Sequence, residues 1–303
     1  MKGLAVLCLS IATPGELMAA CQSRCQRFAR VISAGRANFA LRTGRLTRPR
    51  RIRLEAMTIK VAVVGAAGRM GATVCEAVEA AEDMELTARL DAGDPISSES
   101  LGGADVAVEF SVPSASEANT LAILEAGADA VVGTTGWTDE SLGRVREAAE
   151  RLGRSAVIAP NYALSAVLVM SFAEKAAPYF ESVEVLEMHH PNKVDAPSGT
   201  AIATASRIAR ARAEAGVPAG PDATQTDPDG ARGARIDGVN VHAVRLRGLN
   251  AHEQVMLGNP GEQLVIRQDS FDRSSFMPGV LLAVRSVRGR GGLTWGLDSI
   301  MGL

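Results

Sequence analysis

From Thr58 onward, short runs of β-branched residues alternate with stretches of helical character. The glycine-rich segment GAAGRMG follows the first run, and a helix is expected from about Arg69. Further runs read MELTARLD, DVAVEFS, ADAVVGTTG and SAVIAPN. Strands that alternate with helices form βαβ units with parallel pairing, and continuously apolar runs are typical of strands buried on both faces. The sequence therefore predicts an α/β fold with a doubly wound, Rossmann-like first domain.

The pattern changes after residue 162. We expect a long helix over residues 163–177, then a strand in SVEVLEMHH and a second helix over residues 198–215. From Val239 the chain reads as strands joined by turns such as GNPGE, which favours antiparallel pairing. These elements predict a second domain of α+β type with a mixed open sheet. The last helix candidate, SSFMPGVLLAVRSV, has one apolar face, which we expect to dock on the first domain.

Charge divides the chain unevenly. Residues 1–56 carry Lys2 and ten arginines against two glutamates, a net charge of +9, which leaves −11 of the total of −2 on residues 57–303. An acidic body argues against nucleic acid as a partner. The sequence contains no 18-residue apolar stretch of the kind that spans a membrane, so no membrane partner is expected.

The basic residues 1–56 need a separate explanation. A targeting segment, a nucleic-acid arm and a start codon placed too early all fit their composition. We favour an untranslated or disordered extension, because MTIKVAVVG from Met57 reads as the opening strand of a domain. We therefore expect a dinucleotide-binding domain over 57–162, completed by 272–303, and a substrate domain over 163–271. Cys75 is the one cysteine after residue 56, which fits a reducing compartment and predicts a cytoplasmic location.

A cofactor site is predicted at the carboxyl ends of the first strands. Backbone N–H groups of a glycine-rich turn that precedes a helix hold a pyrophosphate. The spacing here is GxxGxxG rather than GxGxxG, and a tight turn without a ligand remains an alternative. Asp91 ends the second expected strand, where an acid binds the adenosine ribose, although a helix-cap or turn role is equally open. The candidate residues in the turn are Gly65, Ala66, Ala67, Gly68, Arg69 and Met70.

Two later strand ends belong to the same edge of the predicted sheet. Ligands of open α/β sheets bind at this edge, so Gly133, Thr134 and Thr135 are candidates for the nicotinamide ribose. The segment from Ala159 through Pro160 and Asn161 to Tyr162 ends the next strand. Ordinary loop roles remain open for both segments.

The segment EMHHPNKVDAPSGTA contains the side chains best suited to catalysis and substrate binding. His189, His190 and Lys193 can donate protons or bind carboxylates, and the helix expected after Ser198 offers free N–H groups to an anion. This combination predicts a dicarboxylate clamp beside a hydride donor. A zinc site and a solvated turn are the alternatives. No metal is expected, because the other two histidines lie on other elements and no cysteine pair accompanies them.

These motifs, together with VHAVRLRGL and DSFDRSSFMPGVLLAVR, resemble the dihydrodipicolinate reductase family over nearly all of residues 57–303. The resemblance implies that NADH, NADPH or both reduce 4-hydroxy-tetrahydrodipicolinate in lysine and diaminopimelate biosynthesis. It implies His189 as general acid and Lys193 as proton donor. It further implies His190, Gly199 and Thr200 as ligands of the substrate carboxylates. Family members form homotetramers through the sheet of the second domain, and they begin near Met57.

Two departures from the family pattern are visible. Asn192 stands where some members have a third histidine, and Ala163 stands where others have a serine. Neither changes His189 or Lys193. Two other functions stay open: a different nicotinamide-dependent amino-acid dehydrogenase, and a nicotinamide sensor without catalytic activity. Neither needs the combination of HHPNK with SGT, so we expect the reductase.

Overall fold

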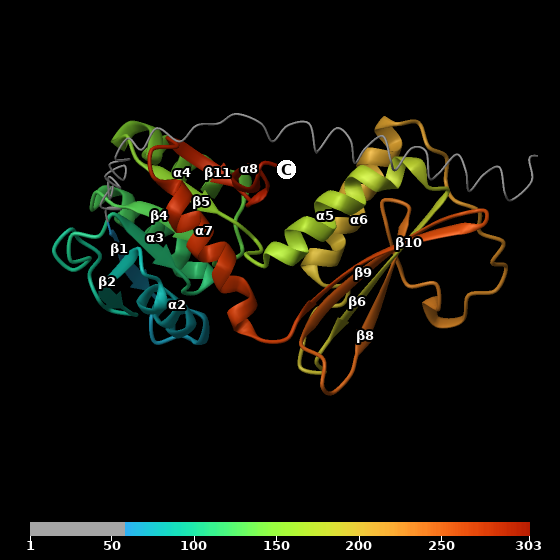
Figure 1. The fold of residues 1–303 in the computed structure, drawn as a ribbon, viewed down its shortest axis with the longest axis horizontal. Helices are drawn as coiled ribbons and strands as arrows, with labels where there is room; N and C mark the ends of the chain where they lie inside the picture. The colour runs from blue at the N-terminus through green and yellow to red at the C-terminus, as the bar shows by residue number, and fades with distance from the viewer. Residues whose placement is uncertain (1–57) are drawn as a thin grey trace, which may run out of the picture. The chain divides into compact units, whose positions relative to one another are not determined.

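The structure, a computed structural model, describes residues 58–303. The basic extension predicted for residues 1–56 lies outside the described residues. Two sheets organise the described part (Figure 1). The first has six strands in the order β11-β5-β4-β3-β1-β2, and the second has five in the order β10-β9-β6-β8-β7.

Every pairing in the first sheet is parallel, as the alternation of strands and helices predicts. The central strands consist almost entirely of residues without solvent exposure, since helices cover both faces of the sheet. The α/β, doubly wound prediction is therefore confirmed. The strands are β1 Ile59–Val64, β2 Met84–Leu90, β3 Val106–Glu109, β4 Asp129–Val132, β5 Ser155–Ile158 and β11 Gly292–Trp295.

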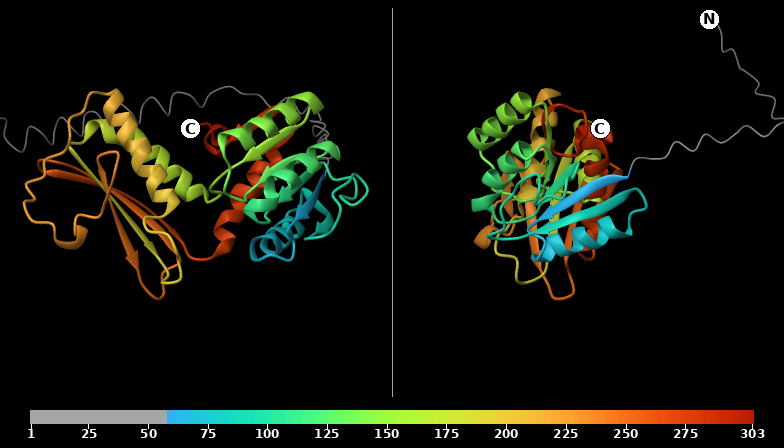
Figure 2. Two further views of the ribbon diagram at one scale, coloured as in Figure 1. Left: turned by 180° about the vertical axis from the view of Figure 1, so that it is seen from behind. Right: turned by 90° about the vertical axis from the view of Figure 1, so that its left-hand side faces the viewer.

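Two pairs of helices cover the two faces of this sheet. Helices α2 (Arg69–Ala80) and α7 (Met277–Val287) pack together in one apolar cluster with β1, β3, β4 and β5. Helices α3 (Pro113–Glu125) and α4 (Asp139–Leu152) pack on the opposite face in a second cluster. The first pair faces the viewer in Figure 1 and the second pair in the left view of Figure 2. Both clusters are made mainly of valine, alanine, isoleucine and leucine, whose burial stabilises the domain.

The second sheet is mixed, as predicted. Strand β6 pairs in parallel with β8 and antiparallel with β9, so β6 separates two strands that are consecutive in the chain. Antiparallel pairing is found between β9 and β10 and between β7 and β8. The strands are β6 Ser182–His189, β7 Ala234–Ile236, β8 Val239–Arg245, β9 Ala251–Asn259 and β10 Glu262–Ser270.

Two long helices lie along one face of the second sheet, α5 (Leu164–Ala176) and α6 (Gly199–Glu214), as Figure 1 shows. Their apolar residues share a core cluster with Val185, Val241 and Val255 of the strands. Among residues 58–303, no helix is long and apolar enough to cross a membrane. The remaining short elements are α8 Asp298–Met301 and the 3₁₀ helices η1 Ala177–Tyr179, η2 Pro228–Gly230 and η3 Arg273–Phe276.

Candidate active site

The glycine-rich turn after β1 is shaped by close backbone contacts. Gly65 has a φ of +84°, and a Cβ on this residue would lie 2.4 Å from the carbonyl oxygen of Phe110. A Cβ on Gly71 would lie 2.0 Å from the carbonyl oxygen of Gly65. Only glycine fits such distances, so the GxxGxxG spacing lets helix α2 begin directly against the end of β1.

The N-terminus of α2 offers polar groups for an anion. Its N-cap, Gly68, has no side chain to occupy the first N–H groups, and the first turn contains no acidic residue. Asp91, at the end of β2, accepts a hydrogen bond of 2.6 Å from the Ala67 N–H. Hydrogen bonds from the Ala92 and Ala67 N–H groups hold the pKa of Asp91 below its usual value. The turn and the carboxylate therefore lie next to each other at the same edge of the sheet.

A cavity of about 410 Å³ opens beside this turn. Nine of the predicted cofactor residues line it, whereas Gly65, Ala66, Ala67, Asp91 and Ala159 lie outside its wall. A Cβ on Gly133 would lie 2.0 Å from the ring of Phe110, so glycine keeps this part of the wall open. The nine are Gly68, Arg69, Met70, Gly133, Thr134, Thr135, Pro160, Asn161 and Tyr162.

Tyr162 has a structural task in this wall. Its hydroxyl donates a hydrogen bond of 2.8 Å to the Val132 carbonyl, and its side chain is buried. Burial raises the pKa of Tyr162 far above its usual range, so the hydroxyl stays protonated. The ring also packs against Phe110, with ring centres 5.9 Å apart. Tyr162 therefore joins the ends of β4 and β5, and its hydroxyl is not available to a ligand.

Five residues of the cavity wall were not predicted. Three of them follow β3 on the same edge of the sheet: Phe110, Ser111 and Pro113. Their position after the strand in DVAVEFS is the signal that could have identified them, as it did at the other strand ends. Arg273 and Phe276 come from η3, more than a hundred residues later. No local pattern relates η3 to the glycine-rich turn.

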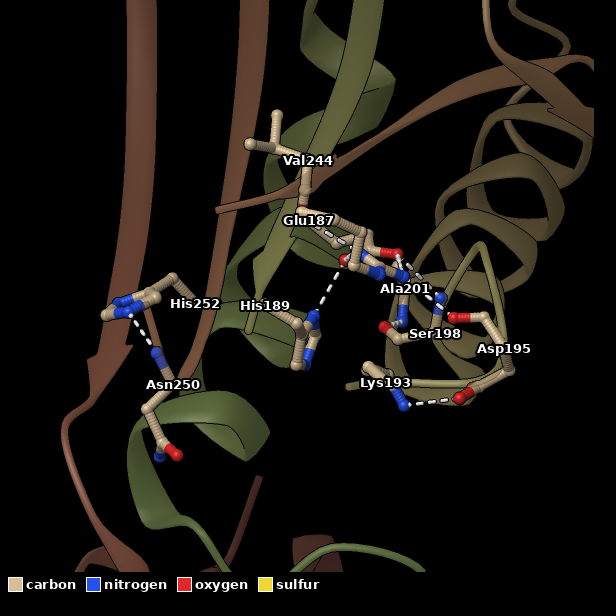
Figure 3. A network of polar contacts seen from close by, with 10 residues as sticks. Glu187, His189, Lys193, Asp195, Ser198, Ala201, Val244, Asn250 and His252 are labelled. Atoms are coloured by element: carbon tan, nitrogen blue, oxygen red, sulfur yellow. Dashed lines mark hydrogen bonds and ion pairs between the residues drawn. The ribbon is translucent and has the colours of Figure 1, made fainter. Parts of the chain in front are cut away.

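The predicted catalytic histidine is held by a buried carboxylate. His189 ends β6, and its Nδ1 lies 2.7 Å from Oε2 of Glu187, a residue without solvent exposure. Glu187 also accepts two hydrogen bonds of 2.8 Å from the Arg245 guanidinium and one of 3.0 Å from the Ser198 N–H. Figure 3 shows His189, Glu187 and Ser198 grouped around these contacts. The parallel register places Arg245 opposite His189, which brings the guanidinium to the carboxylate.

Electrostatics set the protonation of this group. Burial acts to raise the pKa of Glu187, but hydrogen bonds from Arg245 and His189 outweigh it and hold the pKa below its usual value. Burial lowers the pKa of His189, and the contact with Glu187 opposes that shift only in part. Because Glu187 is ionised, Nδ1 of His189 carries the hydrogen, and Nε2 is the ring atom left for proton transfer.

Helix α6 begins at the same place. The Ser198 hydroxyl caps the helix by accepting a hydrogen bond of 3.2 Å from the Ala201 N–H. Lys193, in the loop before the helix, donates a hydrogen bond of 2.6 Å to Asp195. Gly199 and Thr200 lie in the first turn of this helix. The predicted substrate residues His190 and Gly199, like Lys193, lie outside the walls of the cavity beside the glycine-rich turn and of the neighbouring cavity that His189 and Thr200 line.

A second cavity, of about 190 Å³, joins the histidine to the helix start. His189, Ser198 and Thr200 line it, together with His252 and Glu253 of β9, which the sequence did not single out. Pro160, Asn161 and Phe276 belong to the walls of both cavities. Asn161 also donates a hydrogen bond of 3.3 Å to the Thr200 hydroxyl. The cavity beside the glycine-rich turn and the cavity at His189 therefore adjoin.

Across residues 58–303, no three histidine, cysteine, aspartate or glutamate side chains gather as metal ligands would. His189 and His252 each have an Nδ1 contact with a carboxylate, at 2.7 and 2.6 Å. These contacts orient the two rings.

Known proteins match this chain over both domains. The family model for the N-terminal part of dihydrodipicolinate reductase matches residues 59–162, and the model for the C-terminal part matches residues 165–301. The 4-hydroxy-tetrahydrodipicolinate reductase of Beutenbergia cavernae is 60% identical over 248 residues, which are 82% of this chain and all of that protein. The enzyme of the same name from Streptomyces coelicolor is 56% identical over 246 residues, 81% of this chain and 98% of that protein.

A solved structure agrees with these matches. The dipicolinate-bound dihydrodipicolinate reductase from Paenisporosarcina sp. TG-14 superimposes with a TM-score of 0.71 at 37% identity. The alignment covers 80% of this chain and all of that one. Both the sequence and the fold therefore point to one family. The chain belongs to the dihydrodipicolinate reductase family.

Proposed function

We propose that this chain reduces 4-hydroxy-tetrahydrodipicolinate to tetrahydrodipicolinate, with NADH or NADPH as hydride donor, in lysine and diaminopimelate biosynthesis. The observation that carries the proposal is the shared wall of the two cavities, in which Pro160, Asn161 and Phe276 separate the glycine-rich turn from His189. Relatives that bear the reductase name cover both domains of the described chain. An oxidoreductase of the nicotinamide-dependent class follows from both.

The cofactor fits the turn between β1 and α2. Gly68 to Met70 bring the free helix N–H groups to the wall of the cavity, where they would hold the pyrophosphate. Asp91 would accept hydrogen bonds from the adenosine ribose, and Gly133 to Thr135 would line the nicotinamide ribose. When bound, the reduced nicotinamide supplies the hydride. Since Asp91 accepts only two backbone N–H groups in this structure, its carboxylate is available to the ribose.

Substrate carboxylates belong at the start of α6. The Ser198 N–H is taken by Glu187 and the Ala201 N–H by the Ser198 hydroxyl, and Gly199 and Thr200 lie between them. Their N–H groups would bind one carboxylate, and His190, whose buried Nδ1 has no protein partner among the described residues, would bind another. The positive field is local, which explains how an acidic protein binds a dianion.

Either of two side chains would supply the one proton that follows the hydride. Hydride addition to the ring C=C, after loss of water from the hydroxylated precursor, leaves negative charge on the conjugated system. His189, in its imidazolium form, would act as general acid through Nε2, with Glu187 fixing the ring. Lys193 would move from Asp195 to donate from Nζ. The cavity walls keep the ring face toward the cofactor, so the reactants are held in line.

The assembly and the location are also proposed. One face of the second sheet has no helix of the described residues over it, and the strand register places Leu186, Met188, Val244, Met256 and Val265 on this face. Such a face suits pairing with a second copy. The resemblance to the family implies a homotetramer, which we expect to form through the domain of residues 163–271. The domain of residues 57–162 with 272–303 would then remain free to bind cofactor. The biosynthetic role fits the cytoplasm.

The test is a reaction assay with purified chain and the freshly made product of dihydrodipicolinate synthase. The account expects oxidation of NADH or NADPH that depends on this product, and the two rates rank the cofactors. Cofactor binding without oxidation would favour the sensor, and oxidation with an amino acid product alone would favour a different dehydrogenase. Neither alternative explains the Glu187, His189 and Arg245 group beside an anion site.

A further inference from the structure

Three buried polar side chains form a row across the second sheet. The strand register places Glu187 of β6 directly opposite Glu253 of β9, and Glu253 directly opposite Gln268 of β10. Their exposed fractions are 0%, 2% and 8%. Two carboxylates that face each other in a buried place repel strongly and lack the water that would solvate them. One of the two glutamates must therefore hold a proton.

The hydrogen bonds identify Glu253 as the protonated member. Glu187 accepts from Arg245, His189 and Ser198, which stabilise a carboxylate. Glu253 has one polar contact, 2.7 Å from Oε1 to the hydroxyl of Thr204 on α6, and its buried Oε2 has no partner among the described residues. A buried carboxylate with a single donor is costly, whereas the neutral acid is not.

The Thr204 hydroxyl supports the same assignment. Its oxygen also lies 3.0 Å from the carbonyl oxygen of Thr200, which can only accept a hydrogen bond. A hydroxyl has one hydrogen, so a Thr204 that donates to the Thr200 carbonyl accepts from Glu253 in its protonated form, whereas it would donate to an ionised Glu253. The chain of bonds then runs from the acid at Glu253 to the first turn of α6. This turn is where the substrate carboxylates are proposed to bind.

The surroundings of Glu253 contain few charges. Across the sheet, β6 presents Glu187 with its partners His189 and Arg245, and β10 presents the uncharged Gln268. Helix α6 presents Thr204, and its Arg207 is paired with Glu174 and Asp298. Helix α5 presents Ser165, which is hydrogen-bonded to Gln268. Burial, reinforced by the charge of Glu187 and opposed by the Thr204 contact, raises the pKa of Glu253 to about 7.

Glu253 lines the same cavity as His189 and Thr200. We propose that Glu253 is a positioning residue whose bound proton is required for the dicarboxylate to bind. Loss of the proton places a second negative charge opposite Glu187, beside the site for a dianion. It also turns the Thr204 hydroxyl away from Thr200 and toward the new carboxylate, which disturbs the first turn of α6. This inference rests on the proposed function, because it concerns binding of the same substrate class.

The test measures dipicolinate binding to the full chain by calorimetry at about pH 6 and about pH 8. Both carboxylates of this probe remain ionised over that range. The dissociation constant of the wild type is expected to rise ~10-fold between the two conditions, as protonation of one group linked to binding requires. In E253Q, which is neutral at every pH, the two constants should agree to within about twofold.

Glu184→Gln is the matched control. Glu184 lies on the opposite face of β6, pairs with Arg232 and His242, and does not line this cavity. E184Q should retain the wild-type rise. His189 is intact in E253Q, so the same rise in E253Q would assign the effect to another group and overturn the inference, as would a flat wild-type profile.

A measurement on the wild type alone covers the case in which E253Q does not fold. Infrared difference spectra at about pH 8 should gain the band of a protonated carboxyl when dipicolinate binds, because binding draws a proton onto Glu253. Binding without this band would overturn the inference. Failure of the proposed function gives a different result, which is no dipicolinate binding at either pH.

Discussion

Nδ1 of His189 lies 2.7 Å from Oε2 of Glu187, two residues earlier on the same strand. Both side chains point to the face of β6 that α6 covers, where Arg245 adds two hydrogen bonds to the same carboxylate. The Nδ1 side of the histidine is thus held by an ionised group, and His189 lines the cavity that adjoins the cavity beside the glycine-rich turn.

Replacing Glu187 with glutamine should impair both catalysis and stability. The amide cannot hold the His189 ring by a charge-assisted bond, so kcat is expected to fall ~100-fold, within the range seen for general acids. The partly exposed guanidinium of Arg245 also loses its carboxylate partner, which costs about 1–3 kcal/mol of unfolding free energy. Steady-state kinetics and urea unfolding check the two effects. E184Q, on the other face of the strand, should change kcat little; unchanged kcat in a folded E187Q would remove Glu187 from the account.

Replacing Lys193 with alanine should separate cofactor binding from turnover. Lys193 lies in the loop before α6, where Asp195 accepts its hydrogen bond. It does not line the cavity beside the glycine-rich turn. We expect kcat to fall by ~10² to 10⁴ while the Kd for NADH changes by less than about twofold. Lys175→Ala, an exposed lysine near the end of α5, is the control and should match the wild type. Full turnover in K193A would exclude it as the proton donor.

Two helical glycines make a matched pair for the turn. A Cβ on Gly71 would lie 2.0 Å from the Gly65 carbonyl, whereas a Cβ on Gly143 of α4 meets no atom within 4 Å. Gly71→Ala should push α2 away from β1, lose about 1–3 kcal/mol of stability and weaken NADH binding. Gly143→Ala should stabilise the chain by roughly 0.5–1 kcal/mol and leave NADH binding unchanged. Thermal unfolding and fluorescence titration check both, and equal NADH affinity in the two variants would contradict the packing argument.

Glu253 predicts how stability depends on pH. Its pKa in the folded chain is about 7, above the ordinary 4.5, so between these values the folded state binds more protons than the unfolded state. Unfolding free energy therefore falls as pH rises through this window, by roughly 3 kcal/mol if the whole shift is expressed. Urea unfolding at several pH values should show this loss in the wild type relative to E253Q. If the unfolding free energies of the wild type and E253Q change with pH in the same way, the pKa of Glu253 is not raised by folding.

Local sequence patterns predicted most of the fold. Alternation of apolar strands with helices predicted the parallel sheet, and the apolar spacing of the last helix candidate predicted one buried face, which α7 presents through Val280 and Val284. Strand β11 was not predicted, because Gly292–Trp295 has four residues, begins with glycine and gains its stability from pairing with β5. Strands β8 and β9 are consecutive in the chain, but β6 lies between them in the sheet. The short turn between β8 and β9 gives no sign of this topology.

The candidate site was predictable where its residues lie close together in sequence. The segment from His189 to Thr200 brings the histidine, Lys193 and the helix start into one region of the chain. Arg245 and Glu253 could not be found in this way. Arg245 lies 58 residues from Glu187 in the sequence and meets it only because β8 pairs with β6. Glu253 lies opposite Glu187 only because β9 pairs with the other edge of β6. Buried charges in strands are the one signal that could have drawn attention to them.

The most direct test of the central claim follows the hydride itself. The chain is mixed with NADH or NADPH that carries deuterium at the transferable position of the nicotinamide, together with the fresh product of dihydrodipicolinate synthase, and the product is examined by mass spectrometry. The account predicts tetrahydrodipicolinate with a single deuterium on a ring carbon, formed at the rate of cofactor oxidation. Oxidation without deuterium in the ring product would contradict hydride transfer to the dicarboxylate.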